Sequence, residues 1–113
     1  MEPIWRLADE LGLRIITDPY WRGEPGATYS EINSELGVML MPAVLPIRLE
    51  RWLIAHELGH HVNPGYRRPT WLSEAKADRW AVRKLLELYD PEEVDWPERL
   101  FRAKKLEESL LAA

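Results

Sequence analysis

Cysteine is absent from the 113-residue chain, and histidine occurs only three times. Without thiols the protein has no disulfide framework and no thiolate metal site, so a bound metal must be held by histidine nitrogens and carboxylate oxygens. Basic residues are also scarce relative to acidic ones, 15 against 19, which gives a formal charge of -4. This balance argues against binding through neutralised phosphates, so we expect no direct contact with nucleic acid.

Long apolar runs are missing as well. Charged residues interrupt the segment from Met1 to Leu11 every few positions, which predicts neither a signal peptide nor a membrane span. A cytoplasmic protein with no membrane partner is the default expectation. Hydrophobic residues still make up 46% and charged residues 30% of the chain, a composition typical of sequences that fold. The length suits one domain over residues 1–113.

Short β-type runs in the first part of the chain predict a small sheet. An amphipathic helix is expected first, from Glu2 to Leu11, with Gly12 just past its end. Strands are then expected at residues 13–17, 27–32 and 37–41. Turn signals, including Asn33-Ser34, separate these runs, so the economical arrangement is a short antiparallel three-stranded sheet.

Helical spacing dominates the second part of the chain. A long helix is expected at about 46–62, ended by Asn63-Pro64-Gly65. A second helix is expected to begin with Thr70 or Ser73 as its cap and to run to about residue 89. A turn of helix near residues 91–93 and a last helix to about residue 110 follow. The predicted fold class is therefore α+β, with the sheet packed on the first long helix and two to three further helices.

All three histidines fall in one of these helices, within six residues. Two of them enclose an HExxH motif, His56-Glu57-Leu58-Gly59-His60. Helical residues four apart lie about 40° apart in projection, so both imidazoles can point at one ion. Glu57 lies about 100° round from His56, outside the ligand set but within reach of a metal-bound water. The alternative is a pair of surface or core histidines beside a solvated glutamate.

A catalytic zinc site needs a third protein ligand and an open fourth position. His61 points about 100° away from His60 on the same helix, so a carboxylate from elsewhere must complete the set. Glu74 is the best candidate, because the small residues Ala75 and Ala77 leave room beside it. The alternative for Glu74 is an acid that stabilises the start of its own helix.

Asp78 follows Glu74 by one helical turn and faces the same side. Its carboxylate can accept a hydrogen bond from a ligand imidazole, which would orient that ring. The alternative is an exposed ion pair with Lys76 or Arg79, a kind of contact that contributes little stability.

Two segments of the chain together resemble the ImmA/IrrE family of metallopeptidases. They are residues 53–60, Leu-Ile-Ala-His-Glu-Leu-Gly-His, and residues 74–81, Glu-Ala-Lys-Ala-Asp-Arg-Trp-Ala. That family carries an "AHELGH" helix and an "E-x-E-A-[ND]-x-F-A" segment, and the likeness covers roughly residues 37–88. By this resemblance Glu74 takes the place of the zinc-ligand glutamate, Asp78 that of the following Asp/Asn, and Trp80 that of the aromatic residue. The pattern is also similar to the gluzincin clan, and it implies a zincin-like fold.

The expected activity is zinc-dependent hydrolysis of peptide bonds. Zn²⁺ would be held by His56, His60 and Glu74, while Glu57 moves the proton from the water to the leaving amine. The strand at 37–41, directly before the zinc helix, is expected to offer its edge to an extended substrate. The oxyanion donor stays open among four candidates, Tyr29, His61, Tyr66 and Arg67.

The resemblance further implies a regulatory protease that cleaves a helix-turn-helix repressor. Two alternatives stay open: a zinc-binding module that grasps a repressor or antitoxin without cutting it, and a compact generic gluzincin. A purely structural zinc is less fitting, because such sites are normally closed by four protein ligands. The sequence sets no oligomeric state.

Overall fold

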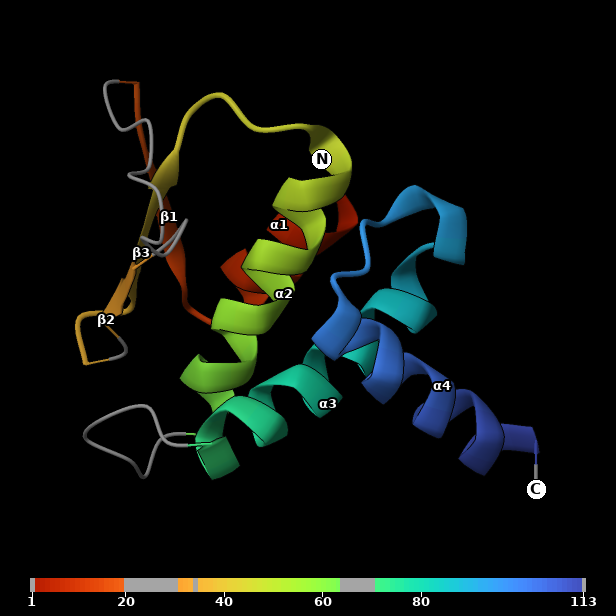
Figure 1. The fold of residues 1–113 in the computed structure, drawn as a ribbon. Coiled ribbons are helices and arrows are strands. Elements are labelled where there is room, and N and C mark those ends of the chain that lie inside the picture. Colours follow the sequence, from red (N-terminus) through yellow and green to blue (C-terminus); the bar gives the residue numbers. More distant parts are fainter. Residues whose placement is uncertain (1, 20–30, 34, 64–70, 113) are drawn as a thin grey trace.

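The structure, a computed structural model, describes residues 2–19, 31–33, 35–63 and 71–112. Its elements are α1 (Pro3–Glu10), β1 (Arg14–Asp18), β2 (Glu31–Asn33), β3 (Val38–Pro42), α2 (Ile47–Val62), α3 (Trp71–Leu88), the 3₁₀ turn η1 (Pro91–Glu93) and α4 (Glu98–Ala112). The sheet lies on one side of α2, and α3 and α4 lie toward the other (Figure 1). The predicted α+β class is confirmed.

The helix boundaries follow the sequence signals closely. Both α1 and α2 begin one residue later than expected, and Gly12, with a positive φ of 78°, follows α1 as predicted. The expected turn of helix is η1, where Glu93 accepts a hydrogen bond from the backbone N–H of Asp90 at 2.9 Å. The predicted capping role of Ser73 is wrong, because α3 already begins at Trp71 and Ser73 is buried in its first turn. Thr70 lies outside the described residues.

The sheet has the expected three strands in the described residues, but it is mixed rather than antiparallel. Its strand order is β1-β3-β2, with β1 parallel and β2 antiparallel to β3. The apolar strand β3 takes the centre and places Met39 and Met41 in the core. The prediction assumed that consecutive strands pair, which is common but is not required when a longer segment joins β1 to β2.

Because β3 is the central strand, the expectation that its edge binds an extended substrate is wrong. Residues 38–40 pair with β1 on one side and with β2 on the other, so their backbone groups are already used by the sheet. The free edges in the described residues belong to β1 and β2. The expected strand at 27–32 is described only from residue 31 onward, as β2, and Asn33 lies at the end of this strand.

α2 runs through the middle of the domain. Every residue from Leu53 to Gly59 is buried, which is typical of a helix covered on all sides rather than of a surface helix. The sheet and α1 pack on one side and α3 on the other (Figure 1). The histidines therefore lie on a helix that neighbouring elements hold in place.

Glu2, at the start of the chain, is tied to α2 and to the residue that follows α3. Its carboxylate accepts hydrogen bonds from Arg51 at 2.7 Å and from the Tyr89 hydroxyl at 2.6 Å. The hydrogen bond from Arg51 is the largest cause that lowers the pKa of Glu2, whereas burial and the Glu2 contact raise the pKa of Tyr89. The Tyr89 hydroxyl also accepts from the backbone N–H of Ile4 at 3.0 Å. These contacts fasten α1 beside α2.

None of the helices in the described residues combines the length and the apolar character that crossing a bilayer requires.

Candidate metal centre

The structure brings His56, His60 and Glu74 together at the contact between α2 and α3. Each histidine places its Nε2 atom 3.1 Å from one carboxylate oxygen of Glu74. The two imidazole rings lie 4.8 Å apart between centroids and at right angles to each other. One ligand atom from each of the three residues lies within 4.8 Å of the others. The three side chains that the sequence singled out thus converge on one point.

Asp78 lies behind this cluster, as expected for a residue that orients a ligand. Its Oδ1 atom is 2.9 Å from Nδ1 of His56, and the residue is only 3% exposed. An ionised Asp78 carboxylate can only accept a hydrogen bond, and this contact then requires the N–H of His56 on Nδ1. Nε2 of that ring is then left to face Glu74.

The ring of His56 lies between two carboxylate groups. A neutral imidazole has one N–H, yet the ring lies between two carboxylates, Asp78 at Nδ1 and Glu74 at Nε2. With a neutral ring whose N–H is on Nδ1, Nε2 has a lone pair and faces the carboxylate of Glu74, and a cation between the two would make this contact favourable. His60 meets the same carboxylate through its own Nε2 atom, so one shared cation would satisfy all three side chains.

The donor set fits a zinc ion. Two imidazole nitrogens and a carboxylate, without thiolates, are the ligands of one common class of catalytic zinc site. With metal–ligand distances near 2.0–2.1 Å, the ligands of a tetrahedral ion lie about 3.3 Å apart. The Nε2–carboxylate separations of 3.1 Å are close to this value. The donor types and these two separations are compatible with a divalent metal ion such as zinc.

Glu57 is placed on α2 next to His56 and is 8% exposed. It is not part of the three-residue cluster, in agreement with the 100° rotation expected from the helix. Glu74 is the most exposed member of the cluster, since its side chain is 29% exposed.

A close approach of two helices sets the position of Glu74 and Asp78. Gly59 of α2 faces Ala77 of α3, and a Cβ atom on Gly59 would lie 2.6 Å from the Ala77 carbonyl oxygen and 2.8 Å from its Cα. Only glycine allows this separation. Ala77 was considered only for the space that it leaves beside Glu74. The contact with Gly59 was not predicted, because a glycine and an alanine on two helices permit a close approach without specifying it.

We therefore expect Gly59→Ala to lower the free energy of unfolding by about 1–3 kcal/mol, the usual cost of overpacking. In a helix free of such contacts the same change is stabilising by about 0.5–1 kcal/mol. Urea denaturation of the metal-free protein measures the difference. Adding Ala77→Gly should not rescue the variant, because the clash is with backbone atoms; recovery in that double variant would show that the Ala77 side chain is the obstacle.

Asp78→Asn tests the hydrogen bond to His56 directly. Residues that hold ligand imidazoles typically contribute 10–100-fold to metal affinity, so we expect a loss of about that size for zinc. Competition with a chromogenic chelator gives the affinity without any activity assay. Asp95→Asn is a matched control, since Asp95 is a half-exposed partner of Arg48 at 3.7 Å. Equal zinc affinity in the two variants would contradict the role of Asp78.

His61 does not reach the cluster. Its Nε2 lies 3.0 Å from the carbonyl oxygen of Leu11 and donates to it, since a carbonyl only accepts. Nδ1 of the same ring is buried without a hydrogen-bond partner among the described residues. His61 is thus bound to the segment between α1 and β1, and this contact does not support its candidacy as an oxyanion donor. The other three candidates, Tyr29, Tyr66 and Arg67, lie outside the described residues.

Trp52 is a further neighbour of the site. Its ring lies 6.2 Å from that of His56 between centroids, in an edge arrangement. The two residues are one helical turn apart on α2, the spacing at which side chains meet. The indole therefore restricts the ring of His56 from the side opposite His60 along the helix.

Comparison of the chain with protein-family models, with curated proteins and with solved structures finds no match.

Proposed function

We propose that the protein is a zinc-dependent endopeptidase of zincin-like fold, with His56, His60 and Glu74 as zinc ligands. The proposal depends above all on one observation, the convergence of both Nε2 atoms on the two oxygens of Glu74. Three protein ligands leave one position of a tetrahedral ion for water, which is the arrangement of catalytic rather than structural zinc sites. The resemblance of residues 53–60 and 74–81 to the ImmA/IrrE metallopeptidases supports the same assignment.

Each residue has a distinct part in this chemistry. Zinc, when bound, supplies a water that ionises near neutral pH and a Lewis acid for the scissile carbonyl. Glu57 accepts the proton of the attacking water and delivers it to the amine that leaves. Asp78 keeps the proton of His56 on Nδ1, so that Nε2 remains a ligand atom.

The free edge of β2 is the better candidate for substrate binding. β2 is an edge strand that contacts α2, whereas the previously expected strand β3 is central. An extended peptide can add to such an edge through backbone hydrogen bonds, and its side chains then determine specificity. The family resemblance favours a helix-turn-helix repressor as the substrate, cleaved in the cytoplasm.

Zinc-loaded and chelator-treated protein, incubated with the repressor encoded nearest to its gene and with a random peptide library, tests the proposal. We expect one equivalent of zinc per chain and cleavage of the repressor that chelation abolishes and added zinc restores. Binding of the repressor without cleavage would favour the regulatory module. Equal cleavage of the library would favour a generic peptidase, and absence of zinc binding would overturn the assignment.

A further inference from the structure

The strand β1 has an edge that no described strand covers, since it lies at the end of the order β1-β3-β2. The backbone N–H of Arg14 donates to Gly37 at 2.7 Å, and the carbonyl of Asp18 accepts from Ala43 at 3.1 Å. In a parallel pair every second residue bonds to the neighbouring strand, so Arg14 and Asp18 turn their backbone groups toward β3. The N–H and C=O groups of Ile15 and Thr17 therefore point to the free edge.

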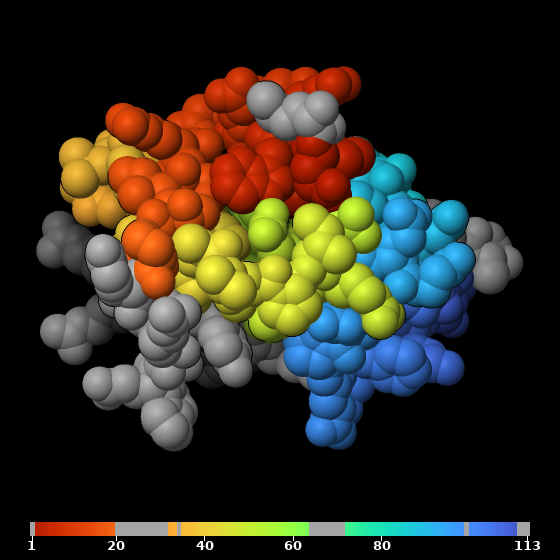
Figure 2. Space-filling view, turned by 90° about the horizontal axis from the view of Figure 1, so that it is seen from above, coloured from red at the N-terminus to blue at the C-terminus, as the bar shows by residue number. Residues whose placement is uncertain are grey.

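This edge is accessible on the molecular surface. In the view from above, the residues of β1 (orange) lie at the surface beside those of α1 (red) (Figure 2). Ile16 is 40% exposed although it is a large apolar residue. A strand of five residues with an apolar centre is a template for another strand.

The sequence of β1, Arg-Ile-Ile-Thr-Asp, is complementary to itself in one antiparallel register. If Ile16 lies opposite Ile16 of a second copy, Arg14 lies opposite Asp18 of that copy and Asp18 opposite its Arg14. Opposite charges across a strand pair are favourable, and like charges are not. Shifting the second copy by two residues in either direction separates both pairs of charges.

The same register also satisfies the free backbone groups. It places Ile15 opposite Thr17 of the second copy, and these are the residues whose N–H and C=O groups point outward. Each Ile15–Thr17 pair exchanges two backbone hydrogen bonds. Because the dimer is two-fold symmetric, Ile15 of each copy pairs with Thr17 of the other, so the pair occurs twice. Charge, apolar contact and backbone bonding thus select one register.

We propose that the protein forms a symmetric dimer in which β1 pairs with β1 of a second copy and joins the two sheets into one. The occupant of the β1 edge is thus another molecule of the same chain. This inference does not depend on the proposed peptidase function, because β2, His56 and Glu74 lie away from the paired edge.

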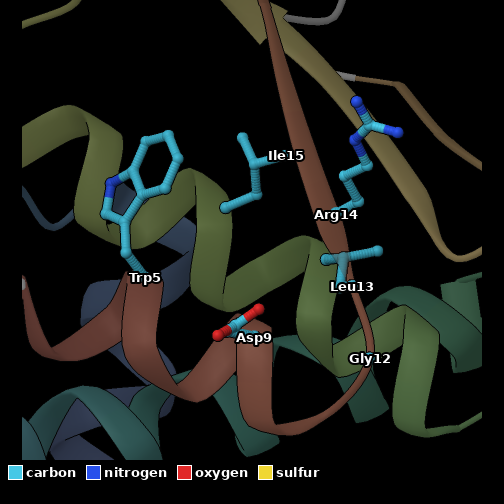
Figure 3. Close-up of a pocket in the computed structure, with 6 residues that line it drawn as sticks. All are labelled: Trp5, Asp9, Gly12, Leu13, Arg14 and Ile15. Atoms are coloured by element: carbon cyan, nitrogen blue, oxygen red, sulfur yellow. The ribbon is translucent and has the colours of Figure 1, made fainter.

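A hollow beside β1 provides room for the second strand. It has a volume of about 430 Å³ and is lined by Trp5, Asp9, Gly12, Leu13, Arg14 and Ile15. In Figure 3 the side chains of Trp5 and Ile15 border its open space, while Asp9 lies lower, near the level of Gly12 and Leu13. Thr17 of the second copy, opposite Ile15, would enter the hollow from the free edge. The Trp5 indole of α1 thus borders this hollow.

Cysteine cross-linking tests the register, because the chain has no cysteine of its own. Opposed residues at a non-hydrogen-bonded position have Cα atoms about 4.5 Å apart, within the range of a disulfide. Ile16→Cys should therefore form a covalent dimer on mild oxidation. Thr17→Cys is the matched control on the same strand: the two copies of residue 17 would lie beyond about 7 Å and should stay uncross-linked. Cross-linking of the control instead would overturn the register.

Charge exchange tests the dimer without cysteine. Arg14→Glu and Asp18→Arg each place like charges opposite each other, and we expect either to weaken dimerisation about tenfold. The double variant restores both pairs and should dimerise like the unmodified chain. Sedimentation equilibrium over a range of concentrations measures the mass, 13.3 kDa for one chain. A single-chain mass at every concentration, or equal dimerisation of all three variants, would overturn the proposal.

Discussion

Replacing Glu57 by glutamine should abolish peptide hydrolysis while zinc remains bound. The amide keeps the size and shape of the side chain, which is 8% exposed and so has little freedom to rearrange. It cannot accept a proton at neutral pH, so the attacking water loses its base. General acid–base catalysis typically contributes about 10²–10⁴-fold, and we expect kcat to fall by at least that range.

Measuring zinc content together with kcat separates catalysis from structure. Glu57 is not one of the three clustered side chains, so the variant should bind one equivalent of zinc with little change in affinity. Glu87→Gln is the matched control, because Glu87 lies on α3 with its side chain 61% exposed; it should retain full activity. Hydrolysis at the normal rate in the Glu57 variant would remove this residue from the mechanism, and loss of zinc would assign it a structural role instead.

The part of the candidate site that lies on α2 can be predicted from the sequence. The relation between His56, Glu57 and His60 depends only on the 3.6-residue period, which is a local property of the chain. The ends of α2 are local as well, since Pro46 and Asn63 flank it. For this reason the expected helix at 46–62 and the observed Ile47–Val62 differ by one residue.

The position of the third candidate ligand, the carboxylate of Glu74, depends on the packing of two helices, so its prediction needed more than periodicity. Glu74 and Asp78 were selected by their spacing, their small neighbours and the family resemblance, and the structure places both beside His56. What brings them there is the close contact between Gly59 and Ala77. That distance is a property of packing, and no pattern within either helix specifies it.

Strand pairing was the least readable feature. The runs that became β1 and β3 were recognised to within one residue at each end. Their pairing, however, joins Arg14 to Val38 in a parallel register. A short-range sequence pattern predicts the apolar alternation of a strand, but it does not predict which other strand pairs with it. The incorrect antiparallel sheet led directly to the incorrect substrate edge, because the central position of β3 was not foreseen.

Replacing Glu74 by alanine should remove the zinc site while leaving the fold in place. The variant keeps both imidazoles but loses the carboxylate that contacts each of them at 3.1 Å. Loss of a partner that merely orients a ligand costs about 10–100-fold in metal affinity, so loss of a ligand should cost 100-fold or more. The Glu74 side chain is partly exposed, and its removal leaves the core intact.

Thermal or urea denaturation with and without zinc measures this loss without an activity assay. At a zinc concentration 1,000 times Kd, binding stabilises the folded chain by about 4.1 kcal/mol. A variant with 100-fold weaker affinity gains only about 1.4 kcal/mol at the same concentration, from the same relation. Glu87→Ala, on the exposed side of α3, should keep the full zinc-dependent gain. An unchanged gain in the Glu74 variant would mean that a different residue completes the ligand set, because the two histidines alone leave the ion with only two protein ligands.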